Sequence, residues 1–593
     1  MSSPPQIDDR IGPWKPGIRS QPPADIRSLA TIYRDGNSFT GFRTARELAQ
    51  FTGLPAHELT AFRPGRLSVH EVLVRVTADI AVPDGPKYED LGISFRTIAG
   101  TILDRHIAPH AAEIAAAHDA LRARVTALVT EALGAPASAP APAAPRPRLP
   151  GLFRRRGAPP AREDPEVREH RLIAGWQRNA VAAADPVDEA AWRALVRVAH
   201  AICGRHGRLR GEPAMIARLV ATLVCNAEGS AMIGRMIEPW LRAGAAAEGY
   251  RLLPAQERPV VMNVKGASAS GKSSMRPLQR RLAAEIGIDW ADFALISPDV
   301  WRKYLLDYDS LGTASKYAGP LTGHEVAIID HKLDRYMAEK ADRRGMSHLL
   351  IDRFRFDSFA PNPDEEEGST LLTRFGHLVY MFFMITPPDA TVERAWRRGL
   401  MYGRYKAVDD LLHHNVEAFT GMPRLFFTWA LKESKRVHYE FLDNSVTEGE
   451  RPRTVAYGWN GEMNVLDIKC MIDVDRYTRI NVDARDAGEV YPDADAMAAT
   501  NNTAFLRQCA CTIPVLNFAA FNTGRIYARL EHGRLVWTDP ECRALAMRDP
   551  ETRAGLAALG ADAAAPAASG TTTPRFLDRI GAQTLGKWAG DPE

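Results

Sequence analysis

The middle of the chain alternates short apolar runs with longer segments in which apolar residues recur every three or four positions. Such alternation predicts an α/β fold: a parallel sheet covered by helices on both faces, with ligands at the carboxyl ends of the strands. Residues 325–341 and 389–399 have the helical spacing. The predicted strands, rich in β-branched or aromatic residues, are 260–264, 293–297, 348–352, 377–385 and 437–442.

The regions on either side of this core have other patterns. Residues 166–250 show helical spacing of apolar residues and predict a helical region. In the N-terminal region, residues 69–80 and 88–107 predict a mixture of strand and helix. Beyond the core, residues 453–482 predict strands, and residues 526–537 predict a hairpin with a His-Gly turn.

Residues 44–62 have the spacing of a helix-turn-helix, with Gly53 at the turn and Leu54, Leu59 and Phe62 on the packing face of the second helix. Two short helices around a glycine also arise for structural reasons alone. The second helix would offer few polar groups to a base edge, so DNA binding is the weaker interpretation.

Composition marks the boundaries between regions. Residues 135–165 are rich in alanine, proline and arginine, and such a segment buries too little apolar surface to offset its ordering entropy. The predicted organisation is an N-terminal mixed region (1–134), an extended linker (135–165), a helical region (166–250), an α/β nucleotide-binding domain (251–450), a C-terminal mixed region (451–559) and a flexible tail (560–593).

The overall composition is that of an ordinary globular protein, with 593 residues of which 45% are hydrophobic and 25% charged. A net charge of +3 does not demand a polyanionic partner. The N-terminus has neither the cationic start nor the apolar core of a secretory signal, and the longest apolar run, 378–385, is too short to cross a bilayer. A cytoplasmic location without a membrane partner is therefore expected.

The strongest chemical signal follows the first predicted strand, where Gly-Ala-Ser-Ala-Ser-Gly-Lys-Ser fits the pattern G-x-x-x-x-G-K-[ST] at every fixed position. In such a loop the backbone N–H groups turn onto phosphates, Lys272 supplies a point charge and Ser273 a magnesium ligand. The expected cofactors are ATP or GTP with Mg²⁺. The predicted nucleotide-binding residues are Gly266, Ala267, Ser268, Ala269, Ser270, Gly271, Lys272, Ser273 and Ser274.

Two carboxylates follow later strands. Asp299 comes after the second strand, where it could accept a proton from an attacking hydroxyl or orient it, or else cap a helix. Asp352 ends the third strand, where it is predicted to lie near the magnesium with Ser273, or else to end the strand in a plain turn.

Residues 391–406 carry two arginine clusters separated by a glycine-bearing bend. They predict a lid whose arginines Arg397, Arg398 and Arg404 close over a triphosphate, with a solvated basic face as the alternative. The adjacent His413 and His414 point to different sides of a helix, which argues against a metal site there.

In combination these segments resemble the zeta-toxin group of P-loop kinases over about residues 259–450. The resemblance implies a P-loop kinase fold in which Lys272 binds the triphosphate, Asp299 activates a sugar hydroxyl and two of the three lid arginines clamp phosphate. The typical substrate of the family is a UDP-activated amino sugar, phosphorylated on its 3′-hydroxyl. Besides the phosphate loop, the resemblance is carried by Ser297-Pro-Asp-Val-Trp-Arg302, Thr322-Gly-His-Glu325, Gly403-Arg404-Tyr405 and His438-Tyr-Glu-Phe-Leu-Asp-Asn-Ser445.

The chain departs from this family at Asp352-Arg353-Phe354-Arg355, where small residues are usual, and in its long additions at both ends. The sequence therefore predicts an ATP- or GTP-dependent phosphotransferase that acts on a hydroxyl-bearing small molecule, an acceptor it does not name. Two alternatives stay open. One is an NTP-hydrolysing regulator whose N-terminal region binds DNA or protein, and the other is a non-catalytic nucleotide-binding module.

Overall fold

The computed structural model describes residues 11–87, 89–134, 165–353, 372–561, 576–578 and 581–589. The chain forms two compact units, one comprising residues 1–24, 73–100 and 245–593 and the other residues 25–72 and 101–244. Residues 135–164 of the predicted linker, and most of the predicted tail, lie outside the described residues.

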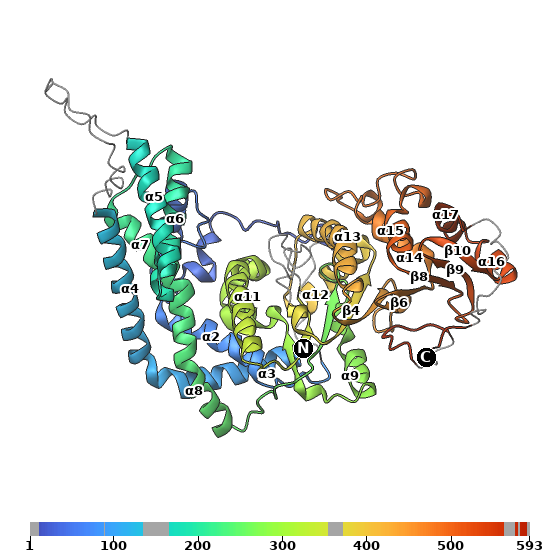
Figure 1. Cartoon of the computed structure of the whole chain (residues 1–593), viewed down its shortest axis with the longest axis horizontal. Coiled ribbons are helices and arrows are strands. Elements are labelled where there is room, and N and C mark those ends of the chain that lie inside the picture. The colour runs from blue at the N-terminus through green and yellow to red at the C-terminus, as the bar shows by residue number, and fades with distance from the viewer. Residues whose placement is uncertain are drawn as a thin grey trace, which may run out of the picture. The chain divides into compact units, whose positions relative to one another are not determined.

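One mixed sheet of ten strands, in the order β10-β9-β8-β7-β6-β5-β4-β1-β3-β2, forms the centre of the larger unit (Figure 1). Five mutually parallel strands correspond to the five predicted ones: β1 (Val260–Lys265), β2 (Phe293–Ile296), β3 (His348–Ile351), β4 (Leu378–Ile385) and β5 (Arg436–Asp443). The sheet continues through β6 (Arg453–Trp459), β7 (Glu462–Val465), β8 (Val515–Ala519), β9 (Ile526–Glu531) and β10 (Arg534–Thr538).

The predicted α/β class is confirmed, but the sheet is not parallel throughout. Strand β6 runs antiparallel to β5, and only the β7–β8 pair beyond it is parallel. The region predicted as a separate mixed C-terminal domain therefore extends the central sheet rather than forming one of its own.

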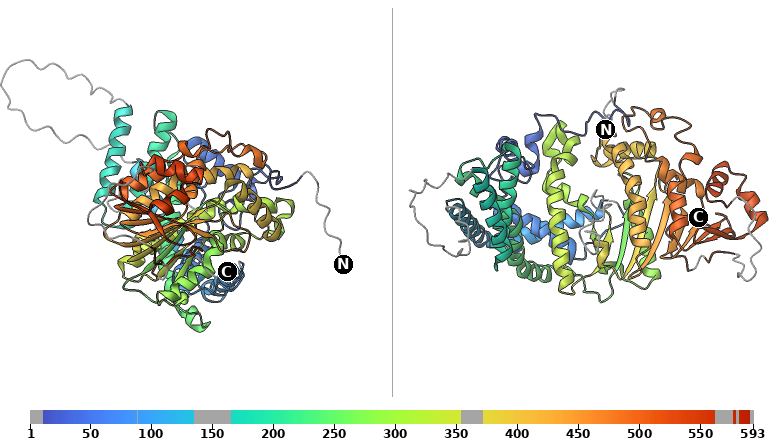
Figure 2. Two further views of the ribbon diagram at one scale, coloured as in Figure 1. Left: turned by 90° about the vertical axis from the view of Figure 1, so that its right-hand side faces the viewer. Right: turned by 45° about the horizontal axis from the view of Figure 1, so that its top comes forward.

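Both faces of the sheet are covered by helices (Figure 2), and β4 explains why its sequence shows no polar alternation. Val379, Met381 and Phe383 pack in the core formed with α13 (Val408–Ala430) and α14 (Ile468–Arg476). The intervening Tyr380 and Phe382 pack in the core formed with α9 (Arg276–Glu285) on the other face. A strand buried on both sides is apolar at every position.

The C-terminal predictions are confirmed in one part and wrong in another. The hairpin of β9 and β10 turns at His532 and Gly533, both with positive φ (48° and 74°), as a two-residue turn of this kind requires. Residues 453–482, predicted as strands, contain β6 and β7 but then α14. Asp467 ends the strand region because its side chain accepts the Cys470 N–H and caps the helix.

The predicted N-terminal region does not form a unit of its own. Its second half is helical rather than mixed, with α2 (Pro64–Asp79) and α3 (Asp90–Thr101), and residues 73–100 belong to the unit of the sheet. The reason is a set of buried polar contacts with α11 (Ala318–Asp342): Asp79 accepts hydrogen bonds from Lys340 (2.7 Å) and Tyr336 (2.5 Å).

The second unit is helical, as predicted for residues 166–250. The helices α4 to α7 run side by side (Figure 1) and enclose a core that includes Leu195, Val198 and Val220. Its helices are α1 (Phe42–Thr52), α4 (Ala111–Gly134), α5 (Pro165–Ala182), α6 (Pro186–His206), α7 (Pro213–Val224) and most of α8 (Ser230–Ala247).

Among the described residues, one helical stretch, Pro213–Ala247, is long and apolar enough to cross a membrane. Of its most apolar window, 61% is buried inside the structure. A core helix has this property, so the stretch is weak evidence for a membrane segment.

The predicted helix-turn-helix is wrong in its second helix. Helix α1 ends at Gly53 with φ of 81°, as expected, but residues 54–62 form no helix. Asn226 supplies hydrogen bonds that a helix would have made internally, since its side chain accepts from Phe62 N (3.3 Å) and donates to Thr60 O (2.7 Å). No recognition helix exists between α1 and α2, so the DNA-binding alternative loses its motif.

Candidate active site

The loop at 266–273 joins β1 to α9 and requires both of its glycines. A Cβ on Gly266 would lie 2.8 Å from the Cβ of Met384 in β4, which is closer than side chains approach. Gly271 has φ of 96° and lies against the side chain of Asn444, just beyond β5. Both positions let the backbone turn tightly at the carboxyl edge of the parallel strands.

Lys272 folds back over this loop. Its Nζ donates to the carbonyl oxygens of Gly266 (3.1 Å) and Ala267 (2.8 Å). Burial lowers the pKa of Lys272, and the nearby carboxylates of Asp352 and Asp299 oppose that shift. The ammonium group thus lies at the loop with two carboxylates close by.

The structure brings together the two predicted magnesium ligands. Ser273 Oγ donates to Asp352 Oδ2 at 2.6 Å, and Arg276 Nη2 lies 3.8 Å from the same oxygen. A hydroxyl and a carboxylate are suitable magnesium ligands, and Mg²⁺ in such sites keeps water and substrate oxygens for its other positions. Elsewhere in the described residues no group of three or more His, Cys, Asp or Glu side chains could hold a metal.

Asp299 lies in the short turn that follows β2, and two arginines hold it. Arg302 Nε donates to one carboxylate oxygen (2.9 Å), and Arg404 donates a short hydrogen bond to the other. Its side chain is half exposed. Enclosure in the cleft opposes ionisation, but the charges of Arg404 and Arg302 outweigh it and hold the pKa of Asp299 well below its usual range.

The helix-cap alternative for Asp299 therefore receives no support, because the turn carries no side-chain cap. A carboxylate so strongly ionised is a poor proton acceptor. It still accepts a hydrogen bond from a hydroxyl, so it is suited to orienting a hydroxyl group rather than to removing its proton.

The arginine-rich segment forms α12 (Pro388–Tyr402), a bend at Gly403 with φ of 69°, and the start of α13. The three predicted lid arginines lie differently. Arg404 pairs with Asp299, and the charge of Arg398 acts on both Asp299 and Lys272.

Arg397 instead pairs with Glu448 at 3.2 Å, and both side chains are more than half exposed. Of the three predicted lid arginines, Arg398 and Arg404 therefore lie near Asp299, whereas Arg397 pairs elsewhere.

Lys406 is a cation of this site that the sequence prediction missed. Its Nζ donates to Ser268 Oγ at 2.9 Å and makes a short hydrogen bond to Nδ1 of His414 in α13. Burial lowers the pKa of Lys406 to about 7, against the charge of Asp410 and with that of Arg398. Burial, together with the charge of Lys406, lowers the pKa of His414 to about 2, so His414 is a neutral acceptor.

Two more missed residues shape the wall beside Asp299. Arg302 also donates to Gly319 O and Thr322 Oγ1, both at 2.8 Å, at the start of α11. Arg353, buried, donates at 2.7 Å to Asp330 and to Asp334 on the same helix. The spacing of Arg302 three residues after Asp299 was a usable signal, whereas nothing in the sequence pairs Arg353 with α11.

One cleft of about 1180 Å³ is lined by Lys272, Ser273, Asp299, Arg302, Asp352, Arg353, Arg398, Arg404 and Lys406. Pockets for a single small molecule usually measure about 300–1,000 Å³. The cleft extends from the 266–273 loop and the lid to α11, so it has room for a second ligand beside a nucleotide.

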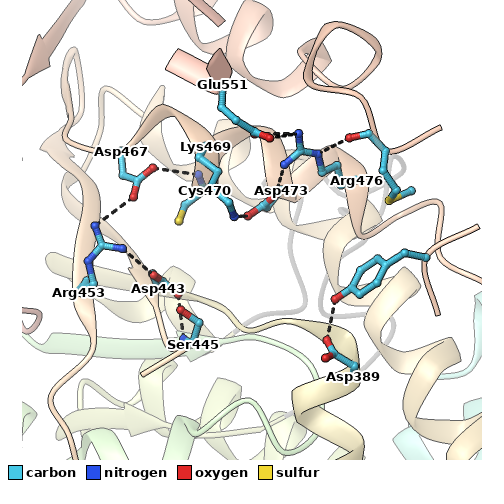
Figure 3. Close-up of polar contacts among 12 residues, drawn as sticks. Asp389, Asp443, Ser445, Arg453, Asp467, Lys469, Cys470, Asp473, Arg476 and Glu551 are labelled. Atoms are coloured by element: carbon cyan, nitrogen blue, oxygen red, sulfur yellow. Dashed lines mark hydrogen bonds and ion pairs between the residues drawn. The ribbon is translucent and has the colours of Figure 1, made fainter. Parts of the chain in front are cut away.

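A network of ion pairs in the C-terminal region supports the strand ends behind this cleft (Figure 3). Arg453 donates to Asp443 (3.0 Å), the last residue of β5, and to Asp467 (3.1 Å). The next residue after β5, Asn444, donates to Ser270 O (2.8 Å) in the phosphate loop. The network thus fixes the end of the strand that holds the loop.

The C-terminal region also contacts α12, the helix of the predicted lid. Arg476, on α14, bridges Asp473 (2.8 Å) and Glu551 (2.7 Å). In a separate contact, Tyr491 donates to Asp389 (2.7 Å) in the first turn of α12. The C-terminal region therefore braces both the loop and the lid.

Comparison with protein-family models, with curated proteins and with solved structures finds no match to this chain.

Proposed function

We propose that the protein is a phosphotransferase that moves the γ-phosphoryl group of ATP or GTP to a hydroxyl of a small molecule, as do the P-loop kinases of the zeta-toxin group that its sequence resembles. The observation that carries this proposal is the convergence of Lys272, the Ser273–Asp352 pair and the Arg404–Asp299 pair in one cleft. These groups come from four segments that are far apart in the sequence.

In this mechanism each side chain has a distinct role. The loop and Lys272 hold the phosphates, and Asp299 accepts a hydrogen bond from the acceptor hydroxyl and directs it at the γ-phosphorus. Because phosphoryl transfer passes through a loose transition state, orientation matters more than proton removal, and a weakly basic carboxylate suffices. Arg398 and Arg404 stabilise the charge that develops on the phosphoryl oxygens.

Mg²⁺ would be held by Ser273 and Asp352, and when bound it would neutralise charge on the β- and γ-phosphates. The acceptor would lie on the other side of Asp299, against the start of α11. A nucleotide-activated sugar suits the size of the cleft, and the buried Arg353–Asp330 pair makes this wall polar and rigid.

The decisive experiment follows the label from γ-labelled ATP or GTP in the presence of a panel of metabolites and nucleic acids. Label on a small hydroxyl compound supports the kinase. Label that appears only as inorganic phosphate, at a rate no panel member changes, supports the hydrolysing regulator instead. Tight nucleotide binding with no turnover would mean a non-catalytic binding module.

Two variants separate the roles of the residues. Lys272→Ala should lower turnover by orders of magnitude without unfolding the chain, because this side chain contacts the loop. Asp299→Asn should abolish transfer, yet leave the chain folded, because Asp299 is half exposed in the cleft and its amide replacement can still accept a hydrogen bond from Arg302. Nucleotide should bind Asp299→Asn at least as tightly as wild type, because a negative charge near the phosphates has been removed. Intact transfer in either variant would contradict the proposed mechanism.

A further inference from the structure

The N-terminal residues 11–20, which we call the strap, belong to the same compact unit as the sheet although more than 200 residues separate them in the sequence. Ile18, Arg19 and Ser20 line the cleft described above. No motif in this stretch suggested a role. Its contacts place it at the mouth of the cleft.

One part of the strap is attached to the lid. The indole Nε1 of Trp14 donates to Glu393 in α12 (3.2 Å), and Ser20 Oγ donates a short hydrogen bond to Asp409 at the start of α13. Trp14 also packs against an apolar cluster that includes Val392 of α12, Leu411 of α13 and Ala269 of the phosphate loop.

The strap also contacts Tyr317, the residue before α11. The backbone N–H of Arg19 donates to the hydroxyl of Tyr317 (3.4 Å). Tyr317 is two residues before Gly319, whose carbonyl holds the Arg302 that pairs with Asp299. The strap therefore passes from the lid to the side of the cleft where the acceptor would lie.

Residues 19 and 20 are held by few hydrogen bonds, whereas Trp14 packs against an apolar cluster and Pro16 is buried. Within residues 11–20 the hydrogen bonds between backbone groups are those of one turn, between Gly12 and Lys15. The bonds to the rest of the chain are few, and each contributes about 1 kcal/mol. Segments held by so few contacts open locally far more often than the core unfolds, on the timescale of lid motions.

We propose that the strap closes the mouth of the cleft and must detach from α13 and Tyr317 before a ligand enters or leaves. The identity of that ligand rests on the proposed function, but the position of the strap does not. Opening of the strap would then limit the rates of nucleotide binding and release without greatly changing the affinity.

The first test needs no ligand. Hydrogen–deuterium exchange is measured on the full chain, on Trp14→Ala and Ser20→Ala, and on Lys15→Ala as a matched control, because the Lys15 side chain is exposed. We expect faster exchange at residues 11–20 and 403–410 in the first two variants and unchanged exchange in the control. Equal exchange in all four proteins would overturn the proposal.

The second test measures gating. Release of a fluorescent ADP analogue, N-methylanthraniloyl-ADP, is followed by stopped flow. Ser20→Ala should speed binding and release about three- to tenfold, in proportion to one lost hydrogen bond, and leave Kd within about threefold. Trp14→Ala should speed both steps at least as much, because it also loses its apolar packing. Lys15→Ala should match wild type.

A reversible cross-link makes the converse test. Ser20→Cys with Asp409→Cys, in a chain whose exposed Cys511 is replaced by serine, should exchange the analogue slowly when oxidised and normally after reduction. The proposal would be contradicted if the rates of analogue binding and release were unchanged in the oxidised protein and in both alanine variants. If wild type binds no analogue at all, the proposed function fails, and the exchange experiment alone decides the strap.

Discussion

Asp299 illustrates how neighbours decide what a residue can do. Its carboxylate lies between Arg302 and Arg404. Each of these arginines is also fixed elsewhere, since Arg302 is anchored to α11 and Arg404 belongs to the lid loop. If the proposed lid opens, Arg404 moves away and the charge next to Asp299 changes. An acceptor hydroxyl that displaces one arginine would meet a carboxylate already ionised.

The charge of Lys406 is sensitive to pH near neutrality, because burial lowers its pKa to about 7. The groups that face it are Asp410 and His414 from α13, Arg398 from α12, Lys272 from the loop, and Asp299. Burial outweighs the attraction of Asp410 and Asp299, so the free site favours loss of the proton. A bound polyphosphate would reverse that preference.

We therefore predict that nucleotide binding takes up a proton at Lys406 and that affinity falls as pH rises above about 7. Below that pH the lysine is already charged, and the dependence disappears. Calorimetry at pH 8 in buffers of different ionisation enthalpy measures the proton count. Lys406→Met should abolish the uptake, whereas Lys303→Met, outside the cleft lining, should not.

The same shift has a consequence for stability. Between about pH 7 and the usual lysine pKa, the unfolded chain binds more protons than the folded one, so the contribution of Lys406 to stability rises with pH over that range. In the calorimetric experiment, a proton uptake by Lys406→Met equal to that of wild type would show that a group other than Lys406 titrates.

At the scale of elements, the lid depends on how α12 ends. Gly399 lies against the ring of Tyr405, where a Cβ would approach within 2.4 Å, and Gly403 reverses the chain. The loop that follows can thus fold back along the helix and bring Arg404 to Asp299. Arg397, on the same helix, faces Glu448 instead.

This arrangement predicts an order among the lid variants. Arg404→Ala and Arg398→Ala should lower kcat about 100-fold or more and change nucleotide Kd much less, because these charges act mainly in the transition state. Arg397→Ala, the matched control, should stay within about fivefold of wild type, as expected for an exposed ion pair. Arg404→Lys should recover only part of the loss. Equal losses in all three alanine variants would contradict our assignment.

A second element, residues 581–589 near the C-terminus, is held on the sheet by a buried carboxyl group. Glu440 of β5 accepts from the backbone N–H groups of Leu585 (2.7 Å) and Gly586 (2.9 Å) and from Thr454 Oγ1 (2.7 Å). Burial raises the pKa of Glu440 to about 7, although these hydrogen bonds favour the ionised form.

We predict that Glu440→Gln destabilises the chain by about 1–3 kcal/mol at pH 6, because its amide N–H₂ would face a buried N–H donor. Since the pKa is raised, the contribution of Glu440 is largest below the usual carboxyl range and is lost as pH rises through about 7. The difference in free energy of unfolding between wild type and Glu440→Gln should therefore be smaller at pH 8 than at pH 6. Urea unfolding measures both values, with Glu285→Gln, an exposed site on α9, as the control. A difference independent of pH would contradict this account.

At the scale of the whole molecule, the larger unit depends on one sheet. The core on the α13 face contains residues of β4 and β5 together with residues of β7, β8 and α14. The 251–450 segment, predicted as one domain, is therefore not closed at β5, because that strand pairs with β6 from His438 to Asp443.

We predict that a chain ending at residue 450 is insoluble or unfolded, because it exposes the edge of β5 and half of an apolar core. A chain ending at residue 561 keeps all ten strands and should fold, with lower stability from the loss of the contacts to Glu440. Solubility and thermal unfolding followed by near-ultraviolet circular dichroism distinguish the two. A soluble, cooperatively folded 1–450 chain would show that the sheet extension is dispensable.

Several features of this protein could be predicted from local sequence. The five parallel strands are short apolar runs bounded by polar residues, and such runs become buried strands in almost any α/β context. The 266–273 loop is specified by its glycines, whose places only glycine can fill. The helices of 166–250 follow from apolar spacing alone. Predictions failed at 54–62, where Asn226 takes the hydrogen bonds of the backbone, and at 468–476, where the cap at Asp467 starts a helix in a segment predicted to be a strand.

What the sequence by itself determined is therefore the α/β class, the central strands and the phosphate-loop candidates, because each depends on neighbours within a few positions. The tertiary structure decided the rest. Folding paired Arg397 with Glu448 and Arg404 with Asp299. It also placed Lys406 next to Ser268, buried Arg353 beside α11, and bonded Ser20 of the strap to Asp409. These contacts join residues up to 389 positions apart, and no local pattern encodes the partner of a charge that the chain meets only after it has folded.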